Sequence, residues 1–112
     1  MSSEVARYMR EVQDILGSLQ QQLQRLNPPI VRTHHIGPFS GAPADFAVTW
    51  IFATRADAQL ANKNEISEVG ARLLLDALLV KDYPANALNT FKFFIASEDE
   101  IRDAGGDFAF FR

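Results

Sequence analysis

The most regular pattern of apolar positions lies at the start of the chain. Apolar residues recur there in alternating steps of four and three, which is the a/d seam of a heptad pattern held for about three heptads. We therefore predict a long first helix over residues 3–26, which either covers a sheet within its own chain or pairs with a partner or a second copy. The residues of the seam are Val5, Met9, Val12, Leu16, Leu19, Leu23 and Leu26.

A second helix is predicted around the run Leu73–Val80, whose residues are apolar on nearly every side. Leucine and alanine dominate this run, which favours a helix over a buried strand. We expect the helix to begin at Asn64 or Glu65, after a break, and to end at Lys81. A glycine inside a helix costs roughly 1 kcal/mol relative to alanine, so Gly70 indicates a close approach of a neighbouring element. We interpret this segment as the central core helix.

Four stretches are predicted as strands because β-branched and aromatic residues alternate in them. In the second stretch the bulky residues take the even positions, so we expect Phe46, Val48, Trp50 and Phe52 to face the core. Capping patterns at Thr54 and Ser97 predict that a helical segment follows the second strand and that a short helix follows the third. The four predicted strands are Ile30–Ile36, Phe46–Thr54, Thr90–Ala96 and Phe108–Arg112.

These elements follow one another in the order α-β-β-α-β-(short α)-β. The connection from the second to the third strand through the core helix predicts a right-handed parallel crossover. We therefore expect a single α+β domain over residues 1–112, with a four-stranded mixed sheet, a long N-terminal helix and a central core helix.

The second face of the predicted sheet is more apolar than a face in contact with water should be. Alternation places Phe94 and Phe111 on this face, whereas Phe91, Phe93, Phe108 and Phe110 are expected to face the core. The first helix, a second copy of the chain or a ligand could cover the second face, and a large exposed apolar patch would indicate an interface. The candidate interface residues are Val5, Met9, Val12, Leu16, Leu19, Leu23, Phe94 and Phe111.

The candidates for chemistry give only weak signals. His34 and His35 are adjacent on a strand, so their rings point to opposite faces and do not converge on one metal ion. Either ring could still act as a general base or a proton switch, or both are ordinary strand residues. A ligand pocket between sheet and helix would use Arg32 as an anion clamp. The candidate pocket residues are Arg32, His34, His35, Trp50 and Tyr83.

The acidic residues from Glu98 to Asp107 lack the spacing of a calcium loop. Carboxylates in the first turn of a helix are already explained by capping and by the positive helix N-terminus. Contact with a basic partner is the alternative use for them. We expect neither a metal site nor a cofactor.

Composition excludes several classes of function. Apolar residues make up 47% of the 112 residues and charged residues 22%, as in an ordinary folded domain. The chain has no cysteine, which excludes a disulfide or a thiolate site. A net charge of −3 and a pI of about 5.2 argue against a nucleic-acid partner. No signal-peptide pattern and no apolar run of about 18 residues is present, so we expect a cytoplasmic protein with no membrane contact.

Two hypotheses on function remain. The first is a non-catalytic protein-protein interaction or regulatory domain, which binds a protein partner or forms a homodimer. The heptad seam, the apolar second face and the absence of a catalytic motif favour it. The second is a small-molecule-binding protein or small enzyme with a pocket near Trp50.

Overall fold

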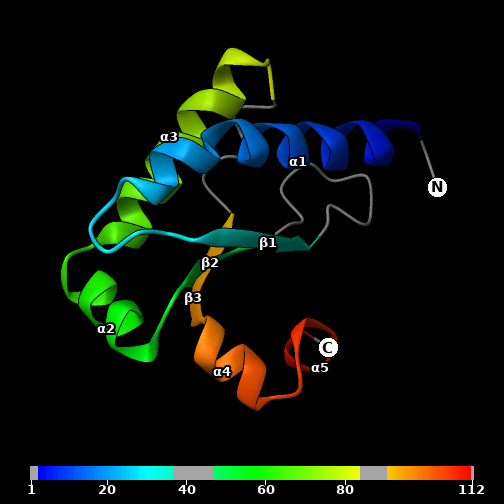
Figure 1. Cartoon of the computed structure of the whole chain (residues 1–112). Coiled ribbons are helices and arrows are strands. Elements are labelled where there is room, and N and C mark those ends of the chain that lie inside the picture. The colour runs from blue at the N-terminus through cyan, green and yellow to red at the C-terminus, as the bar shows by residue number, and fades with distance from the viewer. Residues whose placement is uncertain (1–2, 37–46, 84–90, 112) are drawn as a thin grey trace.

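The computed structural model describes residues 3–36, 47–83 and 91–111, and the side chains from residue 7 onward. The elements follow one another in the order α1-β1-β2-α2-α3-β3-α4-α5 (Figure 1). The first half holds α1 (Ser3–Gln24), β1 (Arg32–Ile36), β2 (Ala47–Phe52) and α2 (Arg55–Lys63). The second half holds α3 (Ile66–Val80), β3 (Lys92–Ser97), α4 (Glu98–Asp103) and α5 (Asp107–Phe110). The α+β class and the long N-terminal helix are confirmed.

The described strands form one mixed sheet in the order β1-β2-β3. β1 is antiparallel to β2, and Thr33 lies opposite Trp50. β2 is parallel to β3, and Trp50 lies beside Ile95. The chain passes from β2 to β3 through α2 and α3, so the predicted parallel crossover is present.

The prediction of a fourth strand over Phe108–Arg112 is wrong. The sheet has three strands in the described part of the chain, and residues 107–110 form the short helix α5. Gly105 and Gly106 have positive φ values of 103° and 107°, a conformation that glycine adopts without strain. The chain therefore reverses at these glycines, and the backbone N–H groups of Phe110 and Phe111 bond to the carbonyls of Gly106 and Asp107. A segment this short has no periodicity that separates a strand from a helical turn.

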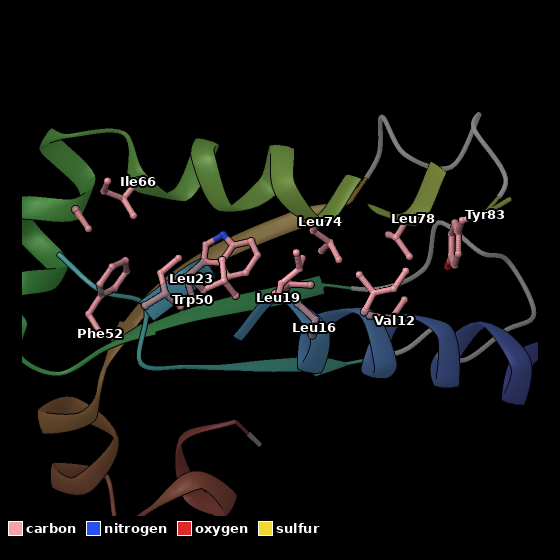
Figure 2. Packing of buried hydrophobic residues seen from close by; sticks show 14 residues of the cluster. Val12, Leu16, Leu19, Leu23, Trp50, Phe52, Ile66, Leu74, Leu78 and Tyr83 are labelled. Atoms are coloured by element: carbon pink, nitrogen blue, oxygen red, sulfur yellow. The ribbon is translucent and has the colours of Figure 1, made fainter. Parts of the chain in front are cut away.

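The main hydrophobic core lies between the first face of the sheet and the helices α1 and α3. Val48, Trp50 and Phe52 of β2 are fully buried there, as the bulky even positions predict, and Phe46 lies outside the described residues. Figure 2 shows Trp50 between the two helices, with the apolar seam of α1 on one side and α3 on the other. A Cβ atom at Gly70 would lie only 3.2 Å from the Trp50 ring, which explains the glycine inside α3.

Local signals in the sequence account for the ends of the helices after β2 and β3. The Thr54 side chain accepts a hydrogen bond from the backbone of Asp57 and caps α2. Glu65 has a left-handed backbone with φ 58° and separates α2 from α3, so the predicted break is confirmed. Ser97 and Glu100 form a complete capping box at the start of α4.

The helices α4 and α5 lie on the opposite side of the sheet from α1 and α3 (Figure 1). They cover the end of the second face where Ile51 and Ala96 are buried against Ile101 of α4. The rest of the second face carries the candidate functional site.

Candidate binding surface on the second face of the sheet

The open part of the second face consists of two rows of residues that cross the sheet. The register places Ile36, Ala47 and Lys92 in one row, and His34, Thr49 and Phe94 in the next. Residues paired across neighbouring strands share one face of the sheet, so all six belong to the second face.

Large apolar side chains are exposed on and beside these rows. Phe94 of β3 is 54% exposed and Ile36 of β1 is 40% exposed. Phe108 of α5 is 85% exposed. We call this surface the open patch and define it as Ile36, Thr49, Lys92, Phe94 and Phe108. Exposed aromatic residues grouped on one face are typical of a binding surface.

A hollow of about 450 Å³ lies at the β1 side of the open patch. The His34 ring forms one wall and stacks on Phe111, with ring centroids 3.8 Å apart and an interplanar angle of 5°. Phe111 is itself in edge contact with Phe110. The hollow is lined by His34, Ile36, Asp107, Phe108 and Phe111.

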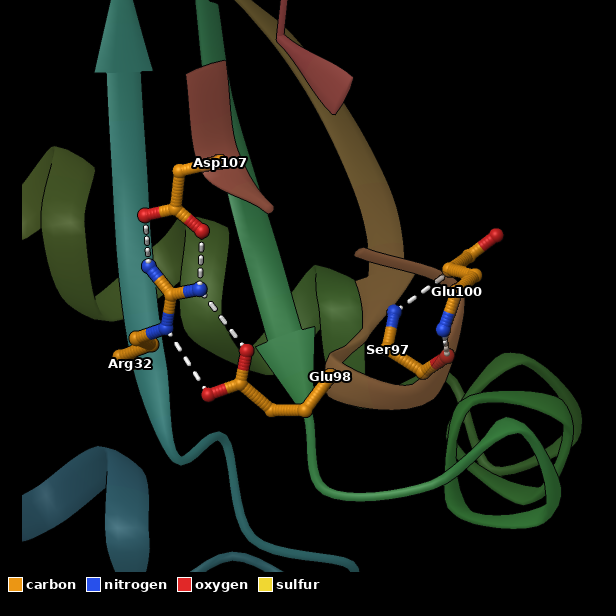
Figure 3. Close-up of polar contacts among 5 residues, drawn as sticks. All are labelled: Arg32, Ser97, Glu98, Glu100 and Asp107. Atoms are coloured by element: carbon orange, nitrogen blue, oxygen red, sulfur yellow. Dashed lines mark hydrogen bonds and ion pairs between the residues drawn. The ribbon is translucent and has the colours of Figure 1, made fainter. Parts of the chain in front are cut away.

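Arg32 holds both short helices against β1 (Figure 3). Its Nε and one terminal nitrogen donate to the two Glu98 carboxylate oxygens at 2.9 and 2.8 Å. Both terminal nitrogens also donate to Asp107, at 2.8 and 2.6 Å. The hydrogen bonds that Arg32 donates to Glu98, and next those to Asp107, raise the pKa of Arg32 above its usual value. We call these three residues the arginine clamp.

The arginine clamp also determines the charge at the rim of the hollow. The hydrogen bonds from Arg32 hold the pKa of Asp107 below its usual value, so this carboxylate stays ionised near neutral pH. Its two oxygens already accept from Arg32, which leaves it a poor general base. Asp107 therefore contributes negative charge and position to the hollow.

Burial lowers the pKa of His34 below its usual value, while Asp107 opposes that shift and Arg32 adds to it. The ring is therefore neutral at neutral pH. Its buried Nδ1 atom has no hydrogen-bond partner among the described residues. A neutral ring stacked on Phe111, with no carboxylate accepting from it, lacks the orienting group that a catalytic histidine normally has.

The residues predicted to form a ligand pocket do not converge. Arg32 and His34 lie near each other on the second face. His35 lies opposite Val48 and points to the first face, where burial lowers its pKa. Trp50 is fully buried and stacks on Phe93 at 5.6 Å, and Tyr83 is buried beyond the end of α3 against Tyr8. Arg32 does bind anions, but they are carboxylates of its own chain.

Most of the predicted interface residues on α1 are buried within the chain itself. Val12, Leu16, Leu19 and Leu23 have at most 8% of their surface exposed and belong to the main core. Met9 is half-buried, and the side chain of Val5 lies outside the described part. Phe94 and Phe111 both lie on the second face.

The acidic residues after β3 mostly contact their own chain. Besides the arginine clamp, Arg55 donates to Asp103 at 2.9 Å and its backbone N–H donates to Asp99. Across the described ranges, no three histidine, cysteine or carboxylate side chains are grouped so that they could share a metal ion. These contacts leave the acidic residues less available to a basic partner.

Four residues of the open patch were not among the candidates from the sequence, namely Ile36, Thr49, Lys92 and Phe108. Phe108 was expected in the core, and its exposure follows from α5 being a helix where a strand was expected. Ile36 ends β1 next to residues outside the described part. Its place in the alternation with Arg32 and His34 was the only signal that it shares their face.

Comparisons of the chain with protein families, with characterised proteins and with solved structures found no match. None of the helices in the described ranges combines the length and apolar character needed to cross a bilayer. The interpretation of function therefore depends on the geometry of the second face.

Proposed function

We propose that this chain is a non-catalytic binding domain that forms a homodimer through the open patch. The observation that carries the proposal is the exposure of Phe94, Phe108 and Ile36 together on one side of the sheet. Fully burying side chains of this size contributes about 1.5–3 kcal/mol each, so leaving them in water is costly. A second copy that covers the patch removes that cost.

A second copy suits this surface because the open patch and the adjoining hollow together offer a cation and an anion, and an exposed aromatic side chain and a cavity. Lys92 is exposed at the β3 side, and Asp107 borders the hollow at the β1 side. An isologous interface needs one surface that complements itself. This surface meets that requirement. Phe94 and Lys92 lie at one side of it, and the hollow and Asp107 lie at the other.

A small-molecule site in the hollow is the second candidate. A volume of about 450 Å³ lies within the range of roughly 300–1,000 Å³ that ligand pockets occupy. Ligand pockets also need a few polar groups free to orient the ligand. Asp107 is already bound to Arg32, so the neutral His34 ring is the remaining polar group of the lining, and this favours the binding of an apolar protein side chain.

The test is the mass of the protein in solution, measured by light scattering on two matched variants beside the unchanged chain. Phe108→Glu places a charge in the patch. Val80→Glu places one on α3, where Val80 is 81% exposed on the other side of the sheet. We expect the unchanged chain and Val80→Glu to be dimers and Phe108→Glu to be a monomer.

A monomer at every concentration for the unchanged chain would refute the proposal. Dissociation by Val80→Glu but not by Phe108→Glu would refute the proposed surface. A small molecule retained in the native mass of a monomer would support the ligand site instead. A location in the cytoplasm remains a prediction from the sequence.

A further inference from the structure

We propose that Phe94 of each copy inserts into the hollow of the other copy, so that the dimer is held by two equivalent aromatic anchors. This inference rests on the proposed function, because it assumes that the open patch is the dimer interface. It goes further by naming the anchor, its pocket and the position of the symmetry axis.

Phe94 has the features of an anchor residue. It stands on β3, a strand at the edge of the described sheet, and about half of its surface is exposed. Its row neighbour on β2 is the smaller residue Thr49. Aromatic residues in such positions carry a large share of the binding energy in protein interfaces.

The hollow has the features of a pocket for an aromatic ring. Three of its five lining residues carry aromatic rings, namely Phe108, Phe111 and His34. The stacked pair of His34 and Phe111 gives it one rigid wall. Aromatic side chains prefer neighbours of this kind, in offset-stacked or edge-to-face arrangements.

The positions of anchor and pocket fit a two-fold axis. His34, Thr49 and Phe94 form one row across three neighbouring strands. Strands lie about 4.8 Å apart, so the anchor on β3 and the pocket wall on β1 are about 10 Å apart on one face. A two-fold axis lying in the interface midway between them exchanges the two sites. Thr49 of β2 then lies close to the axis and faces Thr49 of the second chain.

Charge agrees with this pairing. Lys92 precedes Phe94 by two residues and lies on the same face, so it accompanies the anchor to the rim of the pocket. The carboxylate of Asp107 lies at that rim. The arginine clamp holds two carboxylates and one guanidinium, so the rim keeps a net negative charge that attracts Lys92, although Arg32 weakens this attraction.

The other exposed apolar residues do not offer the same match. Leu60 of α2 is 43% exposed, and Val69, Leu79 and Val80 of α3 are 42%, 48% and 81% exposed. None of these four residues lines the hollow. The charged residues Arg72 and Asp76 lie exposed on α3. Charged side chains therefore interrupt the apolar surface of this helix.

The first test uses the fact that the chain has no cysteine. We would introduce Thr49→Cys alone and treat the full-length protein with a short bismaleimide, which joins two cysteines across a face-to-face contact. Lys81→Cys, exposed after the end of α3, is the matched control. We expect a cross-linked dimer for Thr49→Cys and none for Lys81→Cys.

The second test measures the dimer dissociation constant of Phe94→Ala by sedimentation equilibrium, with Val80→Ala as the control. Loss of a central aromatic anchor weakens binding by about 30-fold or more. Because both copies lose an anchor, we expect a total weakening of about 1,000-fold. Phe94 is half-exposed in the single chain, so circular dichroism and thermal unfolding should show that the variant remains folded.

The outcomes separate this inference from the proposed function. A dimer that cross-links at Thr49→Cys and dissociates on Phe94→Ala supports both. If Phe94→Ala leaves the dimer dissociation constant unchanged, or if Thr49→Cys does not cross-link, the proposed anchor and pocket are wrong. The proposed homodimer would remain supported in either case. An unchanged chain that is monomeric at all concentrations overturns both together.

Discussion

The arginine clamp should control whether α4 and α5 stay on the sheet. The change to test is Arg32→Met, which keeps an apolar stem along β1 but removes all four hydrogen bonds to Glu98 and Asp107. The two carboxylates would then lie near each other without a cation. We expect a modest loss of global stability and a larger local opening of α5.

The magnitude follows from the exposure of the three side chains, which is 34% for Arg32, 38% for Glu98 and 51% for Asp107. Well-shielded hydrogen bonds to charged groups contribute about 1.5–3 kcal/mol, whereas exposed ion pairs contribute about 0.2–1 kcal/mol. All three side chains are more than a third exposed, so solvent screening places the clamp near the lower range. Two bidentate pairs of that strength give a loss of about 1.5 kcal/mol in the free energy of unfolding.

Urea denaturation measures the global loss, and amide hydrogen exchange of residues 107–111 measures the local opening. No residue of α5 is buried, so its amides should exchange much faster once the clamp is gone. Arg55→Met is the matched control, because Arg55 makes a single exposed side-chain pair with Asp103. The reasoning is refuted if the two variants lose equal stability, or if exchange in α5 does not change in Arg32→Met.

Three further changes test the rest of the fold. Ser97→Ala removes the capping box of α4 and should lower the free energy of unfolding by about 1 kcal/mol, seen as a lower melting temperature; an unchanged melting temperature would contradict the role of the cap. Gly70→Ala gains about 1 kcal/mol of helix propensity, but the added methyl group contacts the buried Trp50 ring too closely. Overpacking of this kind costs about 1–3 kcal/mol, so urea denaturation should show a net loss in the free energy of unfolding. Burial lowers the pKa of His34 and His35 below their unfolded value of 6.5, so the unfolded chain binds more protons and the free energy of unfolding should fall as the pH drops below 6.5. Urea denaturation at pH 7.5 and pH 5 checks this, and an equal fall after both histidines are changed to glutamine would contradict it.

The periodic segments of this chain could be predicted from the sequence because each one is decided locally. The seam of α1, the alternation of β2 and the capping box at Ser97 all depend on residues within a few turns of each other. The break before α3 has a local cause as well, the left-handed Glu65. Propensity and pattern agree at these positions, so tertiary contacts do not overrule them.

The error in the sheet came from the last residues of the chain, where the deciding contact is distant. Asp107 is held by Arg32, which lies 75 residues earlier in the sequence. No pattern among Phe108, Phe110 and Phe111 carries that information. The exposure of Phe108 could not be predicted for the same reason.

The candidate surface was predictable only in part. Alternation along β3 placed Phe94 on the second face, and adjacency on a strand separated His34 from His35. The hydrogen-bond partners of Arg32 could not be predicted from the sequence. An arginine that binds carboxylates of its own chain and an arginine that binds a ligand have the same sequence pattern. The hollow depends on how α5 packs against β1, which is a tertiary property.

The mass of the unchanged chain under native conditions tests the central claim most directly. Native mass spectrometry over a range of protein concentrations should show a species with the mass of two 12.5 kDa chains. The fraction of that species should rise with concentration. A mass of one chain at every concentration would contradict the dimer, and with it the proposed use of the second face of the sheet.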